Sequence, residues 1–131
     1  EIEFPEVFDR ENPGFDCFIG NPPFAGALLT AQSNVQGYTD YLRSRFSGTG
    51  GKTDTIAFFF RFGAGAIREG GTLGMLATNS IASGDTRDSG LRRIIESGAS
   101  IYSATRRIPW PGVAAVIVSA IHVYRGRYPS L

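Results

Sequence analysis

The sequence predicts an α/β domain with a doubly wound, mainly parallel sheet, helices on both faces and an antiparallel final strand. Short apolar segments alternate with segments of helical character, which is the order that parallel sheets require. The last two apolar segments are joined by only about seven residues. A parallel crossover needs roughly a dozen residues or more, so the final two strands should be antiparallel.

The predicted elements follow the order β-α-β-α-β-β. Residues 15–20 are apolar and bounded by turn residues, which indicates a buried strand. A short helix is expected at residues 38–46, ahead of a glycine-rich turn. Thr53 or Asp54 can cap a longer helix that runs to about Arg68 and ends at the segment "EGG".

The second half of the chain supplies the other elements. Residues 72–78 are a second buried strand, and several N-cap candidates precede a helix over residues 89–97. The third strand spans residues 99–105, and the apolar segment "VAAVIVSAIHV" at residues 113–123 is the fourth. Sites in doubly wound sheets form beyond the carboxyl ends of strands, and residues 21–24 lie at such an end.

Composition indicates one ordinary domain of 131 residues, 42% of them apolar, with a net charge of +1. No apolar run reaches the roughly 18 residues of a membrane span, and no signal peptide opens the chain. The single Cys17 excludes an internal disulfide framework, so a cytoplasmic setting is expected. Twelve of the 13 basic residues are arginine, which suits phosphate contacts, although a GC-rich genome favours the same bias.

The segment "FIGNPPF" at residues 18–24 carries the chemistry. Two consecutive prolines cannot donate backbone N–H groups, so they end the strand and stiffen the chain that follows. Asn21 precedes a proline and is therefore held in extended geometry. The product is a rigid rim with two acceptors, the side-chain carbonyl of Asn21 and the main-chain carbonyl of Pro22. The flat face of Phe24 follows them.

Two fixed acceptors match an exocyclic amino group, which has two N–H donors. The lone pair of an amine such as the N6 of adenine is delocalised into the ring, so the nitrogen is a poor nucleophile. Accepting both hydrogens localises that lone pair and lets the nitrogen attack an electrophilic methyl group in line. This chemistry needs no metal, and the sequence offers no cluster of metal ligands.

These residues resemble the Asn/Asp/Ser-Pro-Pro-aromatic motif of the amino-methyltransferases. The segments "GKTDTIAFFF", "GGTLGMLATNSIASGDTRDSGLRRI" and "WPGVAAVIVSAI" follow in order. Together they resemble the larger DNA adenine-N6 methyltransferases of restriction–modification and phage-defence systems, of the Eco57I and MmeI type. The resemblance covers nearly all of the chain. It implies the Rossmann-like methyltransferase sheet, of which this chain would be the second half.

The activity that the resemblance implies is methyl transfer from S-adenosylmethionine to the N6 of an adenine flipped out of double-stranded DNA. Trp110 and Phe24 would stack on the flipped base. Asn21 would also contact the cofactor, and Phe59 matches a position near the cofactor's adenine ring. The catalytic motif would be Asn21, Pro22, Pro23 and Phe24.

Basic residues near this site are candidates for contacts with DNA phosphates. Arg87, Arg106 and Arg107 are expected in loops that flank the site, where a solvated surface role is equally compatible. Lys52 lies just ahead of the predicted long helix. The DNA-binding candidates are therefore Lys52, Arg87, Arg106 and Arg107.

Structural roles compete with several of these assignments. A core position is as compatible with Trp110 as a base contact, and it is favoured for Phe59. Cys17 alternates onto a face expected to be buried, and Asp16 is expected to hydrogen-bond at the strand edge rather than act as an acid. Core positions are also expected for Phe58, Phe60, Phe62 and His122.

Part of the family's pattern does not occur in this sequence. No glycine-rich strand-to-helix turn, the family's main cofactor site, precedes Asn21, and no target-recognition region follows the last strand. We therefore expect residues 1–131 to be a partial catalytic domain that is inactive alone. A restriction nuclease domain or subunit is compatible with the parent protein, whereas no membrane or metal partner is expected.

Two other functions fit the same residues. Amino-methyl transfer to RNA guanine or to the N4 of cytosine uses the same chemistry, although cytosine-N4 enzymes more often carry Ser-Pro-Pro. A non-catalytic DNA-binding subunit could keep the fold, although an intact motif at residues 21–24 argues against decay.

Overall fold

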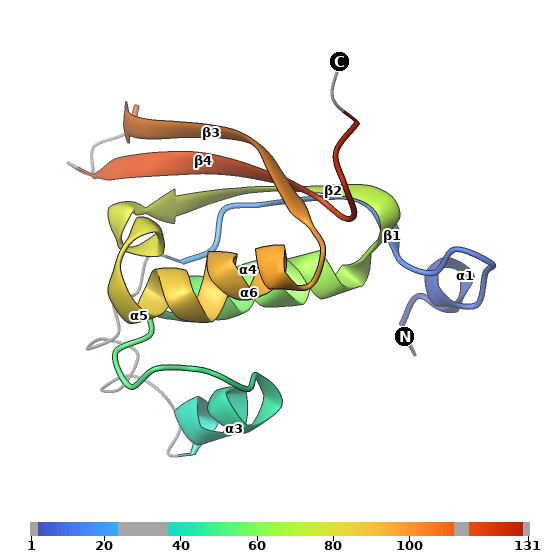
Figure 1. The fold of residues 1–131 in the computed structure, drawn as a ribbon, viewed down its shortest axis with the longest axis horizontal. Helices are drawn as coiled ribbons and strands as arrows, with labels where there is room; N and C mark the ends of the chain where they lie inside the picture. The colour runs from blue at the N-terminus through green and yellow to red at the C-terminus, as the bar shows by residue number, and fades with distance from the viewer. Residues whose placement is uncertain (1–2, 24–36, 112–115, 130–131) are drawn as a thin grey trace.

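A four-stranded sheet and a layer of helices make up the computed structural model, which describes residues 3–23, 37–111 and 116–129 (Figure 1). The strands are β1 (Phe15–Gly20), β2 (Ile67–Thr78), β3 (Ser100–Pro109) and β4 (Ile117–Tyr124). The α-helices are α1 (Pro5–Phe8), α3 (Tyr38–Arg45), α4 (Thr55–Ala66), α5 (Gly84–Arg87) and α6 (Arg93–Glu96). A 3₁₀ turn, η1 (Asn79–Ala82), and a π turn, η2 (Asp88–Arg92), complete the described elements.

The strands are arranged in the order β1-β2-β4-β3. β1 pairs with β2 in parallel, and β4 is antiparallel to both of its neighbours, β2 and β3. β1, β2 and β3 therefore point in one direction, and β4 is inserted between β2 and β3 in the opposite direction. The α/β class and the antiparallel final strand are confirmed, although the sheet is mixed because only β1 and β2 form a parallel pair.

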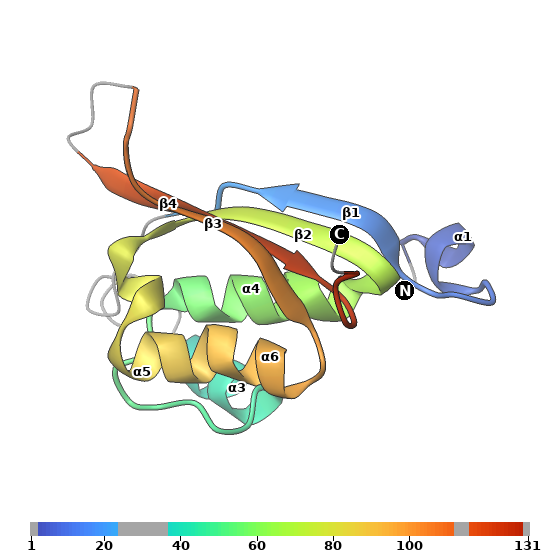
Figure 2. The ribbon, with the colours of Figure 1, turned by 45° about the horizontal axis from the view of Figure 1, so that its top comes forward.

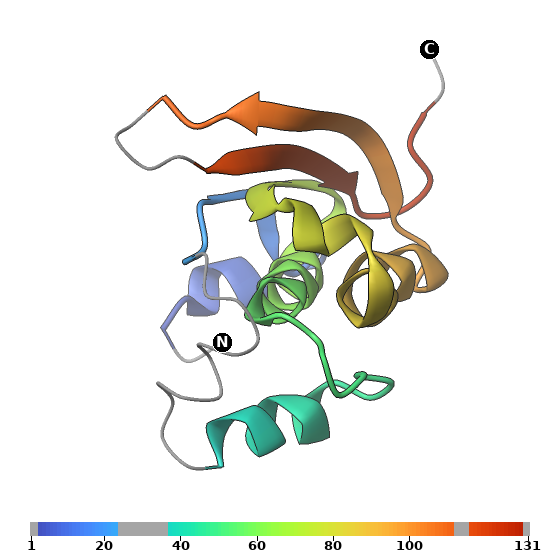
Figure 3. The same ribbon diagram turned by 90° about the vertical axis from the view of Figure 1, so that its left-hand side faces the viewer.

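Helices α4, α5 and α6 cover one face of the sheet, and α3 lies beyond them (Figures 2 and 3). The prediction of helices on both faces is wrong for the described residues. The opposite face carries Cys17, which is exposed, and Ile19, which is 83% exposed. Cys17 was expected to be buried, but no described helix covers the face on which it lies.

The core lies between α4 and the sheet. Phe60 of α4 and the strand residues Ile67, Leu73 and Val123 have no exposed surface. Burial of each such side chain contributes about 1.5–3 kcal/mol to folding. The prediction that Phe62 is a core residue is wrong: it is 46% exposed, because it lies on the outer side of α4. Its ring makes an edge contact with Phe46 instead.

The second helical segment runs from Gly84 through α5, η2 and α6 to Glu96, so it begins five residues earlier than predicted. Gly90, at its centre, is buried against α4. A Cβ added there would lie 3.1 Å from the Cβ of Ala57, so glycine lets the two helices approach closely. The helical segment passes through the π turn η2 where it packs on α4. This contact with α4 cannot be read from the local sequence.

The start of β1 is tied to the start of β2 by charge and aromatic contacts. Arg68 Nε donates a 2.6 Å hydrogen bond to Asp16 Oδ1, and Arg10 lies 3.6 Å from the other carboxylate oxygen. The ring of Phe15 packs edge-on against Phe4 of the neighbouring segment. Asp16 is thus a hydrogen-bonding residue at the strand edge, as predicted.

Two glycines of α4 form a matched pair for testing the packing. A methyl group on Gly63 would lie 2.7 Å from Leu73 Cδ1 and 2.9 Å from Met75 Cε, whereas one on Gly65 would meet open space. Alanine favours the helix over glycine by up to about 1 kcal/mol, and overpacking costs about 1–3 kcal/mol. We expect the free energy of unfolding of Gly63→Ala to be lower than that of Gly65→Ala by about 1–3 kcal/mol in urea denaturation. Equal stabilities would contradict this packing.

The Asp16 contacts should make stability depend on pH. The hydrogen bond from Arg68, followed by the charge of Arg10, lowers the pKa of Asp16 below its ordinary value. A carboxyl whose pKa falls on folding stabilises the protein above its unfolded pKa, and this contribution disappears as pH falls through the folded value. The stability advantage of wild type over Asp16→Asn should therefore be present at neutral pH and vanish in acid. Arg68→Gln should lose most of the same pH dependence, and an advantage that persists in acid would rule this origin out.

Candidate functional site

The carboxyl ends of β1, β2 and β3 lie at one edge of the sheet, at the left of Figure 1. Asn21 follows β1, Asn79 follows β2, and Trp110 follows β3. The N-terminus of α4 lies at the same edge, because α4 leads directly back into β2. Its capping residue is Asp54. Sequence-distant polar residues are thereby brought to one edge, as expected for a site in an α/β sheet.

The Asn-Pro-Pro segment leaves β1 with its asparagine at the surface. Asn21 is exposed, Pro22 is buried and Pro23 is exposed. The buried Pro22 holds the chain against the protein, so the side-chain amide of Asn21 is open to a ligand. Phe24, the fourth residue of the predicted motif, lies outside the described residues.

A cavity of about 220 Å³ opens beside this rim, on the uncovered face of the sheet. Gly20 lines it together with Met75 and Leu76 of β2. A Cβ on Gly20 would lie 3.7 Å from the Met75 side chain, an ordinary contact distance. Sterics at this position therefore do not require glycine.

A buried carboxylate connects α4 to the end of β2. Asp54 is 9% exposed, and its Oδ1 accepts a 3.3 Å hydrogen bond from the backbone N–H of Ile56, which caps the helix. Its Oδ2 accepts a 3.0 Å hydrogen bond from the hydroxyl of Ser80. The Ser80 hydroxyl also lies 2.8 Å from that of Thr78. One carboxylate oxygen thus caps α4, and the other fixes the turn that carries Asn79.

A residue of β4 holds the side chain of Asn79. The hydroxyl of Ser119 donates a 3.3 Å hydrogen bond to Asn79 Oδ1. Asn79 and Ser80 were not among the predicted site residues. The sequence held a signal for this position: Asn79 directly follows one predicted strand as Asn21 follows another, and the carboxyl ends of parallel strands lie at the same edge of the sheet.

Backbone hydrogen bonds hold the segment that carries Lys52 against the helical segment at residues 84–96. The N–H of Lys52 donates a 2.9 Å hydrogen bond to Asp85 Oδ2, and the N–H of Gly50 donates a 3.0 Å hydrogen bond to Ser89 Oγ. Lys52 is exposed, so its ammonium group extends from an anchored backbone near the α4 N-terminus. Arg87 is also exposed, and it forms an ion pair with Asp88 at 2.9 Å.

Arg106 and Arg107 were expected in a loop, but both lie within β3. The pairing of β3 with β4 shifts register between Thr105 and Ile108, so these two arginines form an irregularity in the strand. Arg107 has a φ of 58°, in the left-handed region. Both side chains are exposed. The irregularity lets β3 continue to Pro109, beyond its predicted end.

The two remaining predicted aromatics lie in different places. Trp110 is half-buried at the edge with Asn21, and its backbone N–H donates a 2.9 Å hydrogen bond to Val116 O. Phe59 packs against the hydrophobic core on the inner side of α4. A role for Phe59 in cofactor binding stays a prediction.

Neither a metal centre nor a membrane segment occurs in the parts of the chain that the structure describes. Within them, no three His, Cys, Asp or Glu residues come close enough to hold a metal ion. None of the described helices has the length and apolar character to cross a bilayer.

Comparison with known proteins gives two matches. The family model described as Eco57I restriction-modification methylase matches residues 1–103. Among solved structures, the chain is similar to the type IIL restriction-modification enzyme MmeI in complex with DNA, with a TM-score of 0.69 and 25% sequence identity. The match covers 86% of this chain but 16% of the MmeI chain, so this chain spans a small part of that protein. No curated protein matches.

Asp54 should be a strong determinant of stability at this edge. Asp54→Ala removes a helix cap and leaves Ser80 without its buried acceptor, which together should cost about 2 kcal/mol or more. Asp40→Ala is the matched control because Asp40 is exposed on α3, where a change within about 0.5 kcal/mol is expected. Urea denaturation measures both, and equal effects would show that the Asp54 contacts contribute little.

Proposed function

The chain belongs to the Eco57I restriction-modification methylase family, and we propose that it is part of a site-specific DNA methyltransferase that modifies the N6 of adenine. The observation that carries the proposal is the exposed Asn21 directly after β1, with Pro22 buried behind it. The side-chain oxygen of Asn21 and the carbonyl of Pro22 would be the two acceptors, at the sheet edge where α/β enzymes place their ligands.

The proposed role of the rim is to hold the amino group. Asn21 Oδ1 and the carbonyl of Pro22 would each accept one N–H of the target. Fixed acceptors need no reorganisation during the reaction, so they favour the geometry in which the nitrogen lone pair is localised. Phe24 and Trp110 would stack on the base, which offsets part of the cost of removing it from the duplex.

S-adenosylmethionine is the cofactor that this reaction calls for, and it supplies an electrophilic methyl group when bound. The exposed amide of Asn21 and the space beside Gly20 are compatible with a ligand at the rim. Asn21 and Phe59 are the residues of this chain that would contact it. Asp54 is assigned a structural role, because it caps α4 and accepts a hydrogen bond from Ser80. Because this chain spans only 16% of the MmeI chain, residues 1–131 would be a partial catalytic domain.

Double-stranded DNA is the proposed partner. Support comes from MmeI, which was solved in complex with DNA and part of which resembles most of this chain. The residues that would contact phosphates are Lys52, Arg87, Arg106 and Arg107, because all four are exposed. Lys52 lies in the turn before α4, Arg87 in α5, and both other arginines in β3. Since MmeI is a restriction-modification enzyme, a nuclease domain or subunit in a longer parent protein is compatible with the proposal.

Asn21→Ala in the parent protein tests the proposal. We expect the rate of methyl transfer from labelled S-adenosylmethionine to duplex DNA to fall by about 10²–10³, as for the loss of one preorganised hydrogen-bonding group. DNA affinity should change little, because phosphate contacts supply most of it.

The matched control is Asn12→Ala, which changes an exposed asparagine whose side chain bonds to Glu69 O near the start of β2. Its methylation rate should equal that of wild type. Nuclease digestion and mass spectrometry of the product should identify N6-methyladenine. An unchanged methylation rate in Asn21→Ala would contradict the proposed role of Asn21. Detection of methylated cytosine or methylated RNA guanine would show that the amino-methyl transfer acts on a substrate other than adenine.

A further inference from the structure

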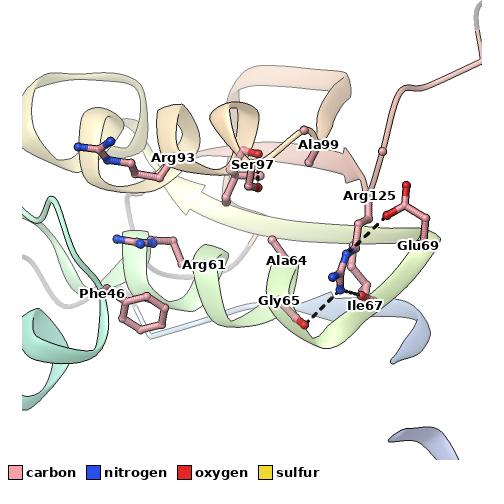
Figure 4. A pocket seen from close by; sticks show the side chains of 13 residues that line it. Phe46, Arg61, Ala64, Gly65, Ile67, Glu69, Arg93, Ser97, Ala99 and Arg125 are labelled. Carbon is pink, nitrogen blue, oxygen red and sulfur yellow. Dashed lines mark hydrogen bonds and ion pairs between the residues drawn. The ribbon is translucent and has the colours of Figure 1, made fainter. Parts of the chain in front are cut away.

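A second cavity lies at the opposite edge of the sheet from Asn21. It has a volume of about 470 Å³ and is bounded by α4, α6, the first residue of β2 and the segment after β4 (Figure 4). Three arginines line it: Arg61 of α4, Arg93 of α6 and Arg125. No role in the proposed methyl transfer accounts for them.

Arg125 has a structural role at one end of this cavity. It donates hydrogen bonds to the carbonyls of Ile67 and Gly65, near the C-terminus of α4, and its Nε lies 3.8 Å from the Glu69 carboxylate. A cation that meets the last carbonyls of a helix stabilises its C-terminus. The charge of Arg125 is therefore already balanced.

The other end holds two guanidinium groups around one turn. The side chains of Arg61 and Arg93 extend towards the end of the cavity where Phe46 lies (Figure 4). Arg61 Nη1 donates a 3.0 Å hydrogen bond to Ser47 O, and the Arg93 guanidinium occupies the space that a side chain on Gly48 would need. Gly48 also has a φ of 72°, in the left-handed region. Glycine therefore suits this turn both by its backbone conformation and by leaving room for Arg93.

Positive charge is in excess at this end. Arg93 is paired with Glu96 at 2.9 Å, whereas Arg61 has no carboxylate within 4.0 Å in the described parts of the chain. Arg61 lies 4.7 Å from the centroid of the Phe46 ring, which compensates its charge only in part. Burial, followed by the charge of Arg93, lowers the pKa of Arg61.

Unused donors accompany this charge. Arg61 has five N–H groups, and only those on Nη1 have acceptors, the carbonyls of Ser47 and Ser89, within the described residues. Nε and Nη2 of Arg61 are therefore available to a ligand on the cavity side. A planar guanidinium with two adjacent free donors matches the spacing of two oxygens on a phosphate.

We propose that the Arg61–Arg93 end of this cavity is a binding site for a phosphate group. The cavity is larger than one phosphate, so the group can be free or attached to a larger molecule such as a nucleic acid. The site stands apart from the methyl-transfer rim, so it does not depend on the function proposed above.

Calorimetric titration of the protein with inorganic phosphate at constant ionic strength tests the site. Wild type should bind one phosphate saturably. Arg61→Gln and Arg93→Gln should each weaken binding about tenfold or more, since each removes a charged donor. Glu96→Gln should strengthen binding, because it frees Arg93 from its carboxylate.

Arg92→Gln is the matched control. It removes the same charge from the neighbouring residue of the same helical segment, but Arg92 pairs with Asp88 and does not line this cavity. Its affinity should stay within about twofold of wild type, because a distant exposed charge is screened by salt. If Arg61→Gln fails to fold by circular dichroism, Arg93→Gln and Glu96→Gln, which change exposed side chains, provide the test. Absence of saturable binding, or equal weakening by Arg92→Gln, would overturn the proposal.

A competition arm identifies the source of the phosphate. A short duplex DNA that displaces inorganic phosphate from wild type, and binds Arg61→Gln more weakly, would identify a nucleic-acid backbone as the ligand. Phosphate binding that the duplex does not disturb would identify a free phosphate or phosphorylated small molecule. Duplex binding that is equal in wild type and all variants, without phosphate binding, would refute the site.

Discussion

The parallel pairing of β1 with β2 is the constraint on which the rest of the structure depends. Parallel strands must be joined by a crossover, and α4 is the helix that leads back into β2. Buried and half-buried residues alternate along β2 from Gly71 to Thr78, so a slip of one residue would turn its core side chains to the open face. The register is therefore fixed, with Gly20 opposite Met75. It sets where Asn21 leaves the sheet relative to Asn79.

Local sequence was sufficient to predict the bounds or direction of an element when only nearby residues determine them. The strand at residues 15–20 has the predicted bounds because its apolar run ends at prolines on one side and a turn on the other. The antiparallel final pair followed from connection length alone. β3 was predicted too short because its continuation past Arg106 and Arg107 depends on pairing with β4. The alternation of side chains along β1 assigned Cys17 to one face of the sheet. It could not predict which of the two faces the helices would cover.

The candidate site was predictable at Asn21 and not at Asp54. Asn21 and the prolines form one continuous segment whose stiffness is a property of its residue types. The link from Asp54 to Ser80 joins residues 26 positions apart, and it exists only because α4 and the end of β2 meet in space. Thr53 and Asp54 were equal candidates for the cap, and burial of the carboxylate against Ser80 decides for Asp54.

Helix α4 has a different charged side chain at each of its ends. Its N-terminus points towards the rim and would attract anions there, but the Asp54 carboxylate already satisfies that end. The rim would then offer the proposed acceptors, the side-chain oxygen of Asn21 and the carbonyl of Pro22, to an amino group rather than to a phosphate. At the C-terminus of α4, Arg125 donates to the carbonyls of Gly65 and Ile67, whereas Arg61 and Arg93 lie at the other end of the same cavity, between α4 and α6 (Figure 4). Under the two proposals, an amine would bind at the rim of the sheet and a phosphate between α4 and α6.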